Sequence, residues 1–155
     1  MSGTFYVGRV VHGIRRRWWK LARPTRVGVR ALALDAEDRV VLVRHTYDTG
    51  WYLPGGGVRR GESLEEAVRR ELAKELGLTG GRLTAVGAYT NRAEGKTDHV
   101  VVFACTEWGR SEVLTSPEIA EVGSFEPSKL PASTSPGTRR RVEEWTGRKE
   151  ISLTW

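Results

Sequence analysis

Two glutamates, Glu71 and Glu75, have the chemical type and the spacing to bind a cation. They are four residues apart in the segment LEEAVRRELAKELGL, so in a helix they project from one face, one turn apart. Like charges in that relation repel each other by roughly a few tenths of a kcal/mol, which a nearby cation relieves. Carboxylate oxygens suit Mg²⁺ or Mn²⁺, which leave positions for water and phosphate. The alternative is an ordinary solvated face, with Arg70 and Lys74 neutralising the acids.

Three consecutive glycines precede this segment. Gly55, Gly56 and Gly57 follow the sequence WYLP. Glycine permits backbone angles and close approaches that a Cβ would forbid, so such a loop lets carbonyl or amide groups reach an ion or a phosphate. A flexible turn is the commoner explanation for glycines taken alone.

The residues between the glycines and Gly77 predict a helix with defined ends. Ser63 is a good N-cap and Glu66 completes a capping box, so the helix is expected to begin at Leu64 and to end near Gly77. The predicted buried stripe is Leu64, Ala67, Val68, Leu72 and Leu76. The predicted charged face is Glu65, Glu66, Arg69, Arg70, Glu71, Lys74 and Glu75.

Taken together, the glycine loop and the helix resemble the signature of the Nudix hydrolase family. That signature reads G, five residues, E, seven residues, R-E, an aliphatic residue, any residue, E-E, any residue, G and an aliphatic residue. The matching residues are Gly56, Glu62, Arg70, Glu71, Leu72, Glu75, Gly77 and Leu78. One defined position differs, because Lys74 stands where the signature has the first acid of the E-E pair.

The resemblance implies an α/β fold, an α/β/α sandwich around a mixed β-sheet. It also implies hydrolysis of a diphosphate linked to another moiety, by attack of water on phosphorus with divalent cations. Glu71 and Glu75 then correspond to catalytic metal ligands, with Glu71 as the general base and the Gly55 carbonyl as a further ligand. Glu62 and Arg70 resemble the family's ion pair that ties the loop to the helix. The metal, Mg²⁺ or Mn²⁺, stabilises charge on the phosphoryl oxygens and lowers the pKa of the attacking water.

Lys74 changes the expected charge of this site by two units. One outcome is that fewer or more weakly bound ions are held there. Another is that its ammonium contacts a substrate phosphate, as lysines do in other phosphate sites. A third is a Nudix fold that binds a nucleotide without hydrolysing it.

Arginines and aromatic residues near the glycine loop are candidates for substrate binding. Arg30 and Arg44 interrupt apolar strands, where a charged side chain needs either a carboxylate partner or an anionic ligand. Trp51 and Tyr52 are candidates for the apolar wall that recognises a base.

The remaining chain reads as alternating strands and turns. Strands are expected at residues 27–34, 39–45, 82–90 and 99–106, the first two as a hairpin. The polar loop 91–98 is a candidate substrate lip. A last helix is expected at 138–146, with Arg139, Arg140 and Arg141 facing either substrate phosphate or solvent, and the tail 151–155 alternates as a strand does.

Other ionisable residues give weaker signals. Glu118 and Glu121 lie where relatives of the family often place an additional carboxylate, although ordinary surface acids are the commoner explanation. His45 and His99 are more simply explained as residues at strand ends than as bases. Cys105 lies in the apolar run VVFAC and is expected to be a buried, reduced thiol.

The first 34 residues carry the net positive charge of the chain. They contain eight Lys or Arg and no acid, within a net charge of +6 over 155 residues. Residues 1–25 are predicted to form a basic amphipathic helix, and residues 26–155 to form one domain. The helix is expected to pack on the domain or in a homodimer; a membrane surface or nucleic acid is the alternative partner.

The sequence therefore predicts a cytoplasmic Nudix-type pyrophosphohydrolase that acts on a nucleoside diphosphate derivative, a small molecule. No apolar run reaches the roughly 18 residues that span a membrane, so stable membrane insertion is not expected. The alternative is a catalytically weak or inactive nucleotide-binding module.

Overall fold

A computed structural model describes residues 25–93, 95–111 and 116–155. The predicted basic N-terminal helix lies outside the described residues. The described strands are β1 (Thr25–Leu34), β2 (Val40–His45), β3 (Trp51–Tyr52), β4 (Gly55–Gly57), β5 (Leu78–Ala93), β6 (Lys96–Arg110) and β7 (Ile119–Phe125). The described helices are α2 (Leu64–Leu76) and α3 (Pro136–Trp145).

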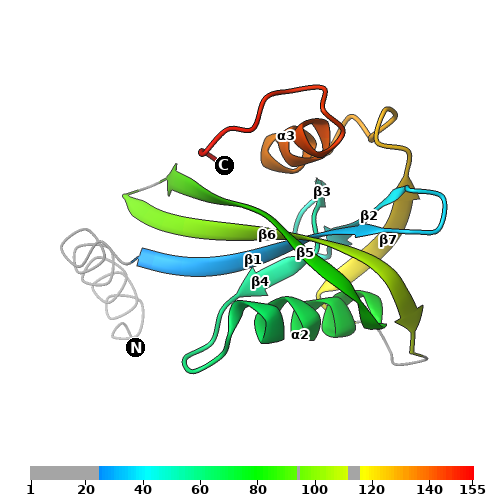
Figure 1. The fold of residues 1–155 in the computed structure, drawn as a ribbon, viewed down its shortest axis with the longest axis horizontal. Helices are drawn as coiled ribbons and strands as arrows, with labels where there is room; N and C mark the ends of the chain where they lie inside the picture. Colours follow the sequence, from blue (N-terminus) through cyan, green and yellow to red (C-terminus); the bar gives the residue numbers. More distant parts are fainter. Residues whose placement is uncertain (1–24, 94, 112–115) are drawn as a thin grey trace, which may run out of the picture.

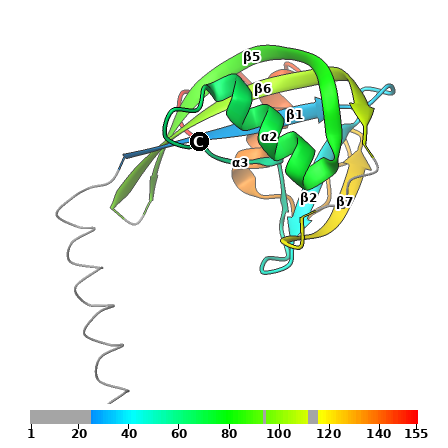
Figure 2. The same ribbon diagram turned by 90° about the horizontal axis from the view of Figure 1, so that it is seen from below.

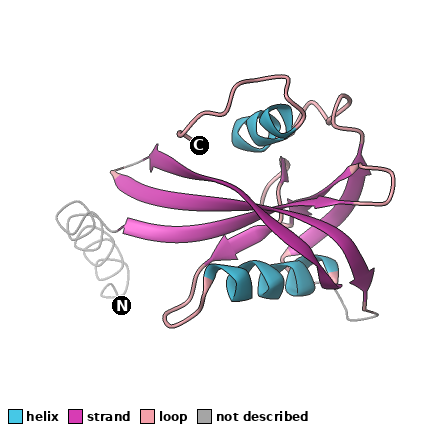
Figure 3. Cartoon of the chain, in the orientation of Figure 1, coloured by secondary structure: helices cyan, strands magenta, loops and turns pink. Residues whose placement is uncertain are grey.

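The helices lie on opposite faces of one mixed sheet, which confirms the predicted α/β/α sandwich (Figure 1). Figure 2 shows α2 lying across the sheet on one side, and Figure 3 shows the strands as the middle layer between the two helices. The principal strand order is β3-β2-β1-β6-β5, with β4 paired to β1 and β7 paired to β2. Only β1 and β6 run parallel among the described pairs.

The central strand β1 sets the position of the glycine loop. One end of β1 pairs with β2, as the predicted hairpin requires, and the other end pairs antiparallel with β4. In that register Arg30 is opposite Gly55 and Val29 is opposite Gly56. Strand pairing therefore places the Arg30 backbone directly beside the glycines.

Two apolar cores occupy the two faces of the sheet. Beneath α2, the buried apolar residues include Val29, Ala31, Val41, Val43, Ala67, Val68, Leu72, Leu76 and Cys105. Toward α3, they include Leu32, Leu42, Trp51, Leu53, Tyr89, Val102 and Val142. Alternate residues of β1 thus point to opposite cores, as the two-residue period of a strand demands. The prediction of a buried Cys105 is confirmed.

Several element predictions were too short or incomplete. β5 and β6 are 16 and 15 residues long, so most of the predicted lip over residues 91–98 continues a long hairpin. β7 was not predicted, because its acids and glycine conceal a strand that pairs with β2. The tail makes only an isolated bridge, between Thr154 and Thr90. Within the part of the chain that the structure describes, no helix is long and apolar enough to cross a membrane.

Candidate active site

Helix α2 begins and ends where the capping residues predict. The Ser63 side chain accepts a hydrogen bond from the Glu66 amide at 3.2 Å, and the Glu66 carboxylate accepts one from the Ser63 amide at 2.7 Å. Gly77 ends the helix with φ of 65°, a left-handed conformation that favours glycine. Leu64 is exposed, since it lies in the first turn, but the rest of the predicted apolar stripe is buried. These ends determine where the α2 carboxylates lie.

Glu71 and Glu75 are buried, which argues against the alternative of an ordinary solvated face. Their relative exposures are 5% and 3%. The glycine loop covers them: the Gly55 amide donates to Oε2 of Glu75 at 2.9 Å. A Cβ at Gly56 would lie 2.7 Å from Oε1 of Glu71. A loop with side chains at Gly56 cannot pack this closely, so the glycines and the carboxylates form one unit.

Arg70 links the glycine loop to the helix. Its guanidinium forms two hydrogen bonds with Glu62, at 2.6 and 2.9 Å, and one with the Gly57 carbonyl at 3.0 Å. It also forms an ion pair with Glu71. The hydrogen bond from Arg70, together with one from the Arg59 amide, lowers the pKa of Glu62 to about 2. The geometry matches a positioning role for Glu62 and Arg70.

The two buried carboxylates differ in their partners. Glu71 contacts Arg70 and lies 3.8 Å from the Lys74 ammonium. Burial raises the pKa of Glu75 to about 7, and the hydrogen bond from Gly55 and the charge of Arg30 oppose that rise. Glu75 is therefore a buried acid whose negative charge is incompletely compensated, which favours a bound cation beside it.

Arg30 extends from β1 to the glycine loop. Its Nη1 donates to the Gly55 carbonyl at 3.0 Å and to the Leu53 carbonyl at 3.4 Å. Burial lowers its pKa, while the charges of Glu75 and Glu71 raise it. The sequence left its partner open between a carboxylate and a ligand; the structure gives it two carbonyls and places its charge near both acids. A carbonyl oxygen has two lone pairs, so Gly55 can still accept a further ligand.

Lys74 lies between Glu71 and Glu118. Its Nζ donates to Oε2 of Glu118 at 3.2 Å, and that contact raises the pKa of Lys74 most. Of the two acids predicted as additional carboxylates, Glu118 thus reaches the α2 residues. Glu121 instead accepts a hydrogen bond from Nε of Arg44 at 3.1 Å.

Arg44 and Trp51 contact other residues of the fold. Arg44 is paired with Glu121 across β2 and β7, the salt-bridge alternative for this arginine. Trp51 is only 8% exposed, and its ring packs edge-on against Phe125 at 4.9 Å between centroids. Neither side chain opens onto the buried carboxylates in the way that Arg30 and Lys74 do.

An aromatic group lies beside β2; it contains Tyr52, which the sequence named as a candidate for base recognition, and Tyr47, which it did not. His45 stacks on Tyr47 with 5.0 Å between ring centroids, and Tyr52 is 5.8 Å from His45. The Tyr52 hydroxyl donates to Asp48 at 2.7 Å. Burial and the charge of Arg30 lower the pKa of His45. A hollow of about 470 Å³ lies along residues 44–49.

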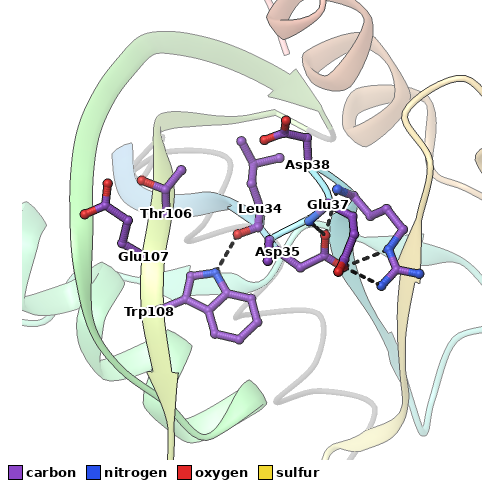
Figure 4. A pocket seen from close by; sticks show the side chains of 9 residues that line it. Leu34, Asp35, Glu37, Asp38, Thr106, Glu107 and Trp108 are labelled. Carbon is purple, nitrogen blue, oxygen red and sulfur yellow. Dashed lines mark hydrogen bonds and ion pairs between the residues drawn. The ribbon is translucent and has the colours of Figure 1, made fainter.

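A second hollow, of about 550 Å³, lies at the turn between β1 and β2 (Figure 4). Two of its acids are already paired, since Arg39 binds Asp35 and Glu37 at 2.9 Å each. Trp108 closes one side by donating from its indole to the Leu34 carbonyl at 2.8 Å. None of the predicted site residues lines this hollow, so it contributes no candidate site.

The donor set at α2 fits a divalent cation held by few protein ligands. Among the described residues, no group of three or more His, Cys, Asp or Glu side chains is arranged to hold a metal ion. Glu71, Glu75 and the Gly55 carbonyl offer hard oxygen atoms within one packed unit. Mg²⁺ and Mn²⁺ accept one or two carboxylates and fill other positions with water and phosphate, so these residues fit such an ion.

Comparisons with known proteins agree with this geometry. The model of the NUDIX domain matches residues 24–146, which is most of the chain and includes β1, the glycine loop, both helices and β7. The chain belongs to the NUDIX family. It is therefore a Nudix hydrolase of the pyrophosphohydrolase class, as predicted.

Individual relatives show the extent of the likeness. A Bacillus subtilis protein named "Putative 8-oxo-dGTP diphosphatase" is 27% identical over 128 residues, which cover 82% of this chain and 85% of that protein. The nucleoside triphosphatase NudI of Escherichia coli O139:H28 is 46% identical over 50 residues, 32% of each chain.

Solved structures share the Nudix fold. The MutT NUDIX hydrolase of Burkholderia pseudomallei superposes with a TM-score of 0.68 at 28% identity, covering 77% of this chain and 97% of that one. The MutT protein of Methanosarcina mazei Go1 gives 0.70 at 23% identity, covering 83% and 98%. The second likeness concerns the fold alone.

Proposed function

We propose that this Nudix chain hydrolyses a diphosphate bond of a nucleoside triphosphate or of another nucleoside diphosphate derivative, with Mg²⁺ or Mn²⁺. The observation that carries the proposal is the burial of Glu71 and Glu75 against the glycine loop. Ionising two carboxylates in one buried unit costs free energy, and a bound cation offsets that cost. A phosphate substrate supplies the remaining ligands of such a cation.

The names of relatives support nucleoside triphosphates as the first substrates to test. The B. subtilis relative is named for an oxidised deoxyguanosine triphosphate, and the E. coli relative for nucleoside triphosphates generally. The identity to the first is 27%, and the second matches over 50 residues. The proposal therefore extends to the class of nucleotide and not to a particular base.

In this proposal Glu71, Glu75 and the Gly55 carbonyl hold the metal. The bound metal would stabilise negative charge on the phosphoryl oxygens. Glu71 accepts the proton of the attacking water. Arg70 orients the Glu71 carboxylate and is itself held by its ion pair with Glu62. The metal ligands lie on β4 and α2, which pack together and hold the general base in a fixed position.

The substrate contacts follow from the surroundings of the carboxylates. Arg30 is anchored by one nitrogen to the Gly55 carbonyl, so the remaining N–H groups of its guanidinium can bind phosphate oxygens. Tyr52, with His45 and Tyr47, forms an aromatic wall for a base. Arg44 and Trp51 precede His45 and Tyr52 in the sequence and contact each other, with Arg44 over the Trp51 ring at 5.9 Å.

A substrate panel tests this proposal. The full chain is assayed against nucleoside triphosphates, including an oxidised guanine nucleotide, and against dinucleotide and sugar-linked diphosphates, with Mg²⁺, Mn²⁺ or a chelator. The expected result is metal-dependent release of a nucleotide product from at least one of them. Nucleotide binding without any turnover would overturn the proposal and support a nucleotide-binding module.

A further inference from the structure

Lys74 joins two carboxylates that come from different parts of the chain. Its Nζ lies 3.2 Å from Oε2 of Glu118 and 3.8 Å from Oε2 of Glu71. Glu71 is on the same helix, three residues earlier, whereas Glu118 lies one residue before β7. The ammonium therefore connects α2 to the segment that leads into β7.

Stability does not explain this arrangement. The side chains of Lys74 and Glu118 are 41% and 58% exposed, and ion pairs at that exposure contribute little to the free energy of unfolding. Glu71, in contrast, is buried. A charge beside a buried carboxylate is screened weakly, so the Lys74 ammonium acts mainly on the electrostatics of the candidate active site.

The charges around Glu71 and Glu75 leave a small negative excess. The carboxylates are Glu71, Glu75 and Glu118, and the cations are Arg30 and Lys74. Arg70 pairs with both Glu62 and Glu71, so Arg70 and Glu62 together add one charge of each sign and leave that excess unchanged. An acid in place of Lys74 would raise that excess by two units and add a carboxylate ligand. The described residues thus provide charge for a single divalent ion rather than for several.

We propose that Lys74 is a tethered cation that takes the place of one divalent ion. The site then binds a single Mg²⁺ or Mn²⁺ ion through Glu71, Glu75 and the Gly55 carbonyl, and Glu118 holds the ammonium in position. A lysine ammonium is a compact point charge that a chelator cannot remove. This inference takes the metal ligands from the proposed function. It adds that the site binds one ion.

The test counts bound ions directly. Mn²⁺ alone is titrated into the full chain, with free Mn²⁺ measured by electron paramagnetic resonance and the dissociation constant by calorimetry. The variants are K74E and the charge swap K74E/E118K. K129E is the control, because Lys129 also pairs with a glutamate three residues away, Glu126 at 2.8 Å, in the connection between β7 and α3.

The parent chain is expected to bind one Mn²⁺. K74E is expected to bind a second ion, or to bind the first about tenfold more tightly or better, because two charge units change beside the cation. The charge swap restores an ammonium in the same place and returns the count to one. K129E behaves as the parent.

Three results would overturn the inference: two ions in the parent chain, a K74E variant that matches K129E, or a charge swap that retains the K74E behaviour. The proposed function is judged separately, from turnover in the substrate panel. Absence of turnover with the expected Mn²⁺ counts would reject the function and leave the tethered cation standing. Metal-dependent turnover together with a K74E variant that matches K129E in both ion count and affinity would reject the tethered cation and leave the proposed function standing.

Discussion

The two helices bury charged side chains in opposite ways. On α3, Arg141 and Glu144 are each 1% exposed and form an ion pair of 2.8 Å. On α2, the buried pair is Glu71 and Glu75, which carry the same sign. Buried opposite charges neutralise each other and need no ligand, whereas buried like charges depend on cations from elsewhere. The comparison separates a structural charge cluster from a functional one.

The α3 cluster is covered by the C-terminal tail, although Nε of Arg141 and Oε2 of Glu144 have no hydrogen-bond partner among the described residues. Arg141 donates to the Thr154 carbonyl at 3.1 Å, and its guanidinium carbon lies 3.8 Å from the centre of the Tyr89 ring. Glu144 accepts the Ser152 amide at 3.0 Å. These contacts attach the C-terminal tail to the sheet. The prediction that Arg141 faces phosphate or solvent was wrong, because the tail covers it.

The α2 cluster includes groups from three other parts of the chain. Arg30 comes from β1, the Gly55 amide from β4, and Glu118 from the segment before β7. Two of these residues can still bind a ligand: Arg30 has further N–H groups, and the Gly55 carbonyl has a second lone pair. This incompleteness is what a metal and a phosphate would fill.

The largest expected effect is on stability, from breaking the α3 pair. R141M leaves the buried charge of Glu144 without a partner, which costs about 3–5 kcal/mol. The double variant R141M/E144L removes both charges and is expected to recover most of that loss. Urea unfolding measures both changes. Turnover per folded molecule should be unchanged in both variants, and a large loss of turnover would contradict the structural role of this cluster.

An extra methyl group in the glycine loop is expected to act on activity alone. In G56A the new Cβ would meet Oε1 of Glu71, at 2.7 Å in the present geometry. The carboxylate is the end of a flexible side chain, so it moves at little cost in stability, but displacement of a catalytic group lowers kcat about a hundredfold.

G57A is the matched control for this change. A Cβ at Gly57 has nothing within 4 Å, so turnover is expected to stay at the parent level. Steady-state kinetics of the two variants gives the comparison. Equal activity in G56A and G57A would show that the loop does not position Glu71.

A smaller effect is expected from the link between loop and helix. The pKa of Glu62 is lowered to about 2 by Arg70 and the Arg59 amide. The unfolded value is about 4.3, so this stabilisation is fully present above that pH and is lost as pH falls toward about 2. E62Q should therefore be less stable than the parent at pH 7, and the difference should shrink in acid. Urea midpoints at several pH values check this; a constant difference would contradict it.

The bounds of helix α2 were predictable from the sequence, but the burial of its two carboxylates was not. The capping residues Ser63, Glu66 and Gly77 act within a few residues of the helix ends, so the bounds of α2 follow from the sequence. The burial of Glu71 and Glu75 depends on β4, which packs on α2 only because it pairs with β1. A helical pattern contains no information about such a neighbour, and it therefore left an ordinary solvated face open as the alternative.

Long-range partners were the other unpredictable part. The contact of Lys74 with Glu118 spans 44 residues, and that of Arg30 with Gly55 spans 25. The register of β1 against β4 would have identified the second contact, had the glycines been read as a strand. Arg141 was misplaced for the same reason, since the tail that covers it was not predicted to pack on α3.

A matched pair of substitutions tests the central comparison most directly. E75Q and E144Q each remove one buried negative charge from a helix, one from each face of the sheet. Metal-dependent turnover and urea unfolding are measured for both, alongside the parent chain. E75Q is expected to lose turnover and to keep or gain stability, while E144Q loses about 3–5 kcal/mol of stability and keeps its turnover per folded molecule. Parent-like hydrolysis by E75Q would contradict the assignment of the active site.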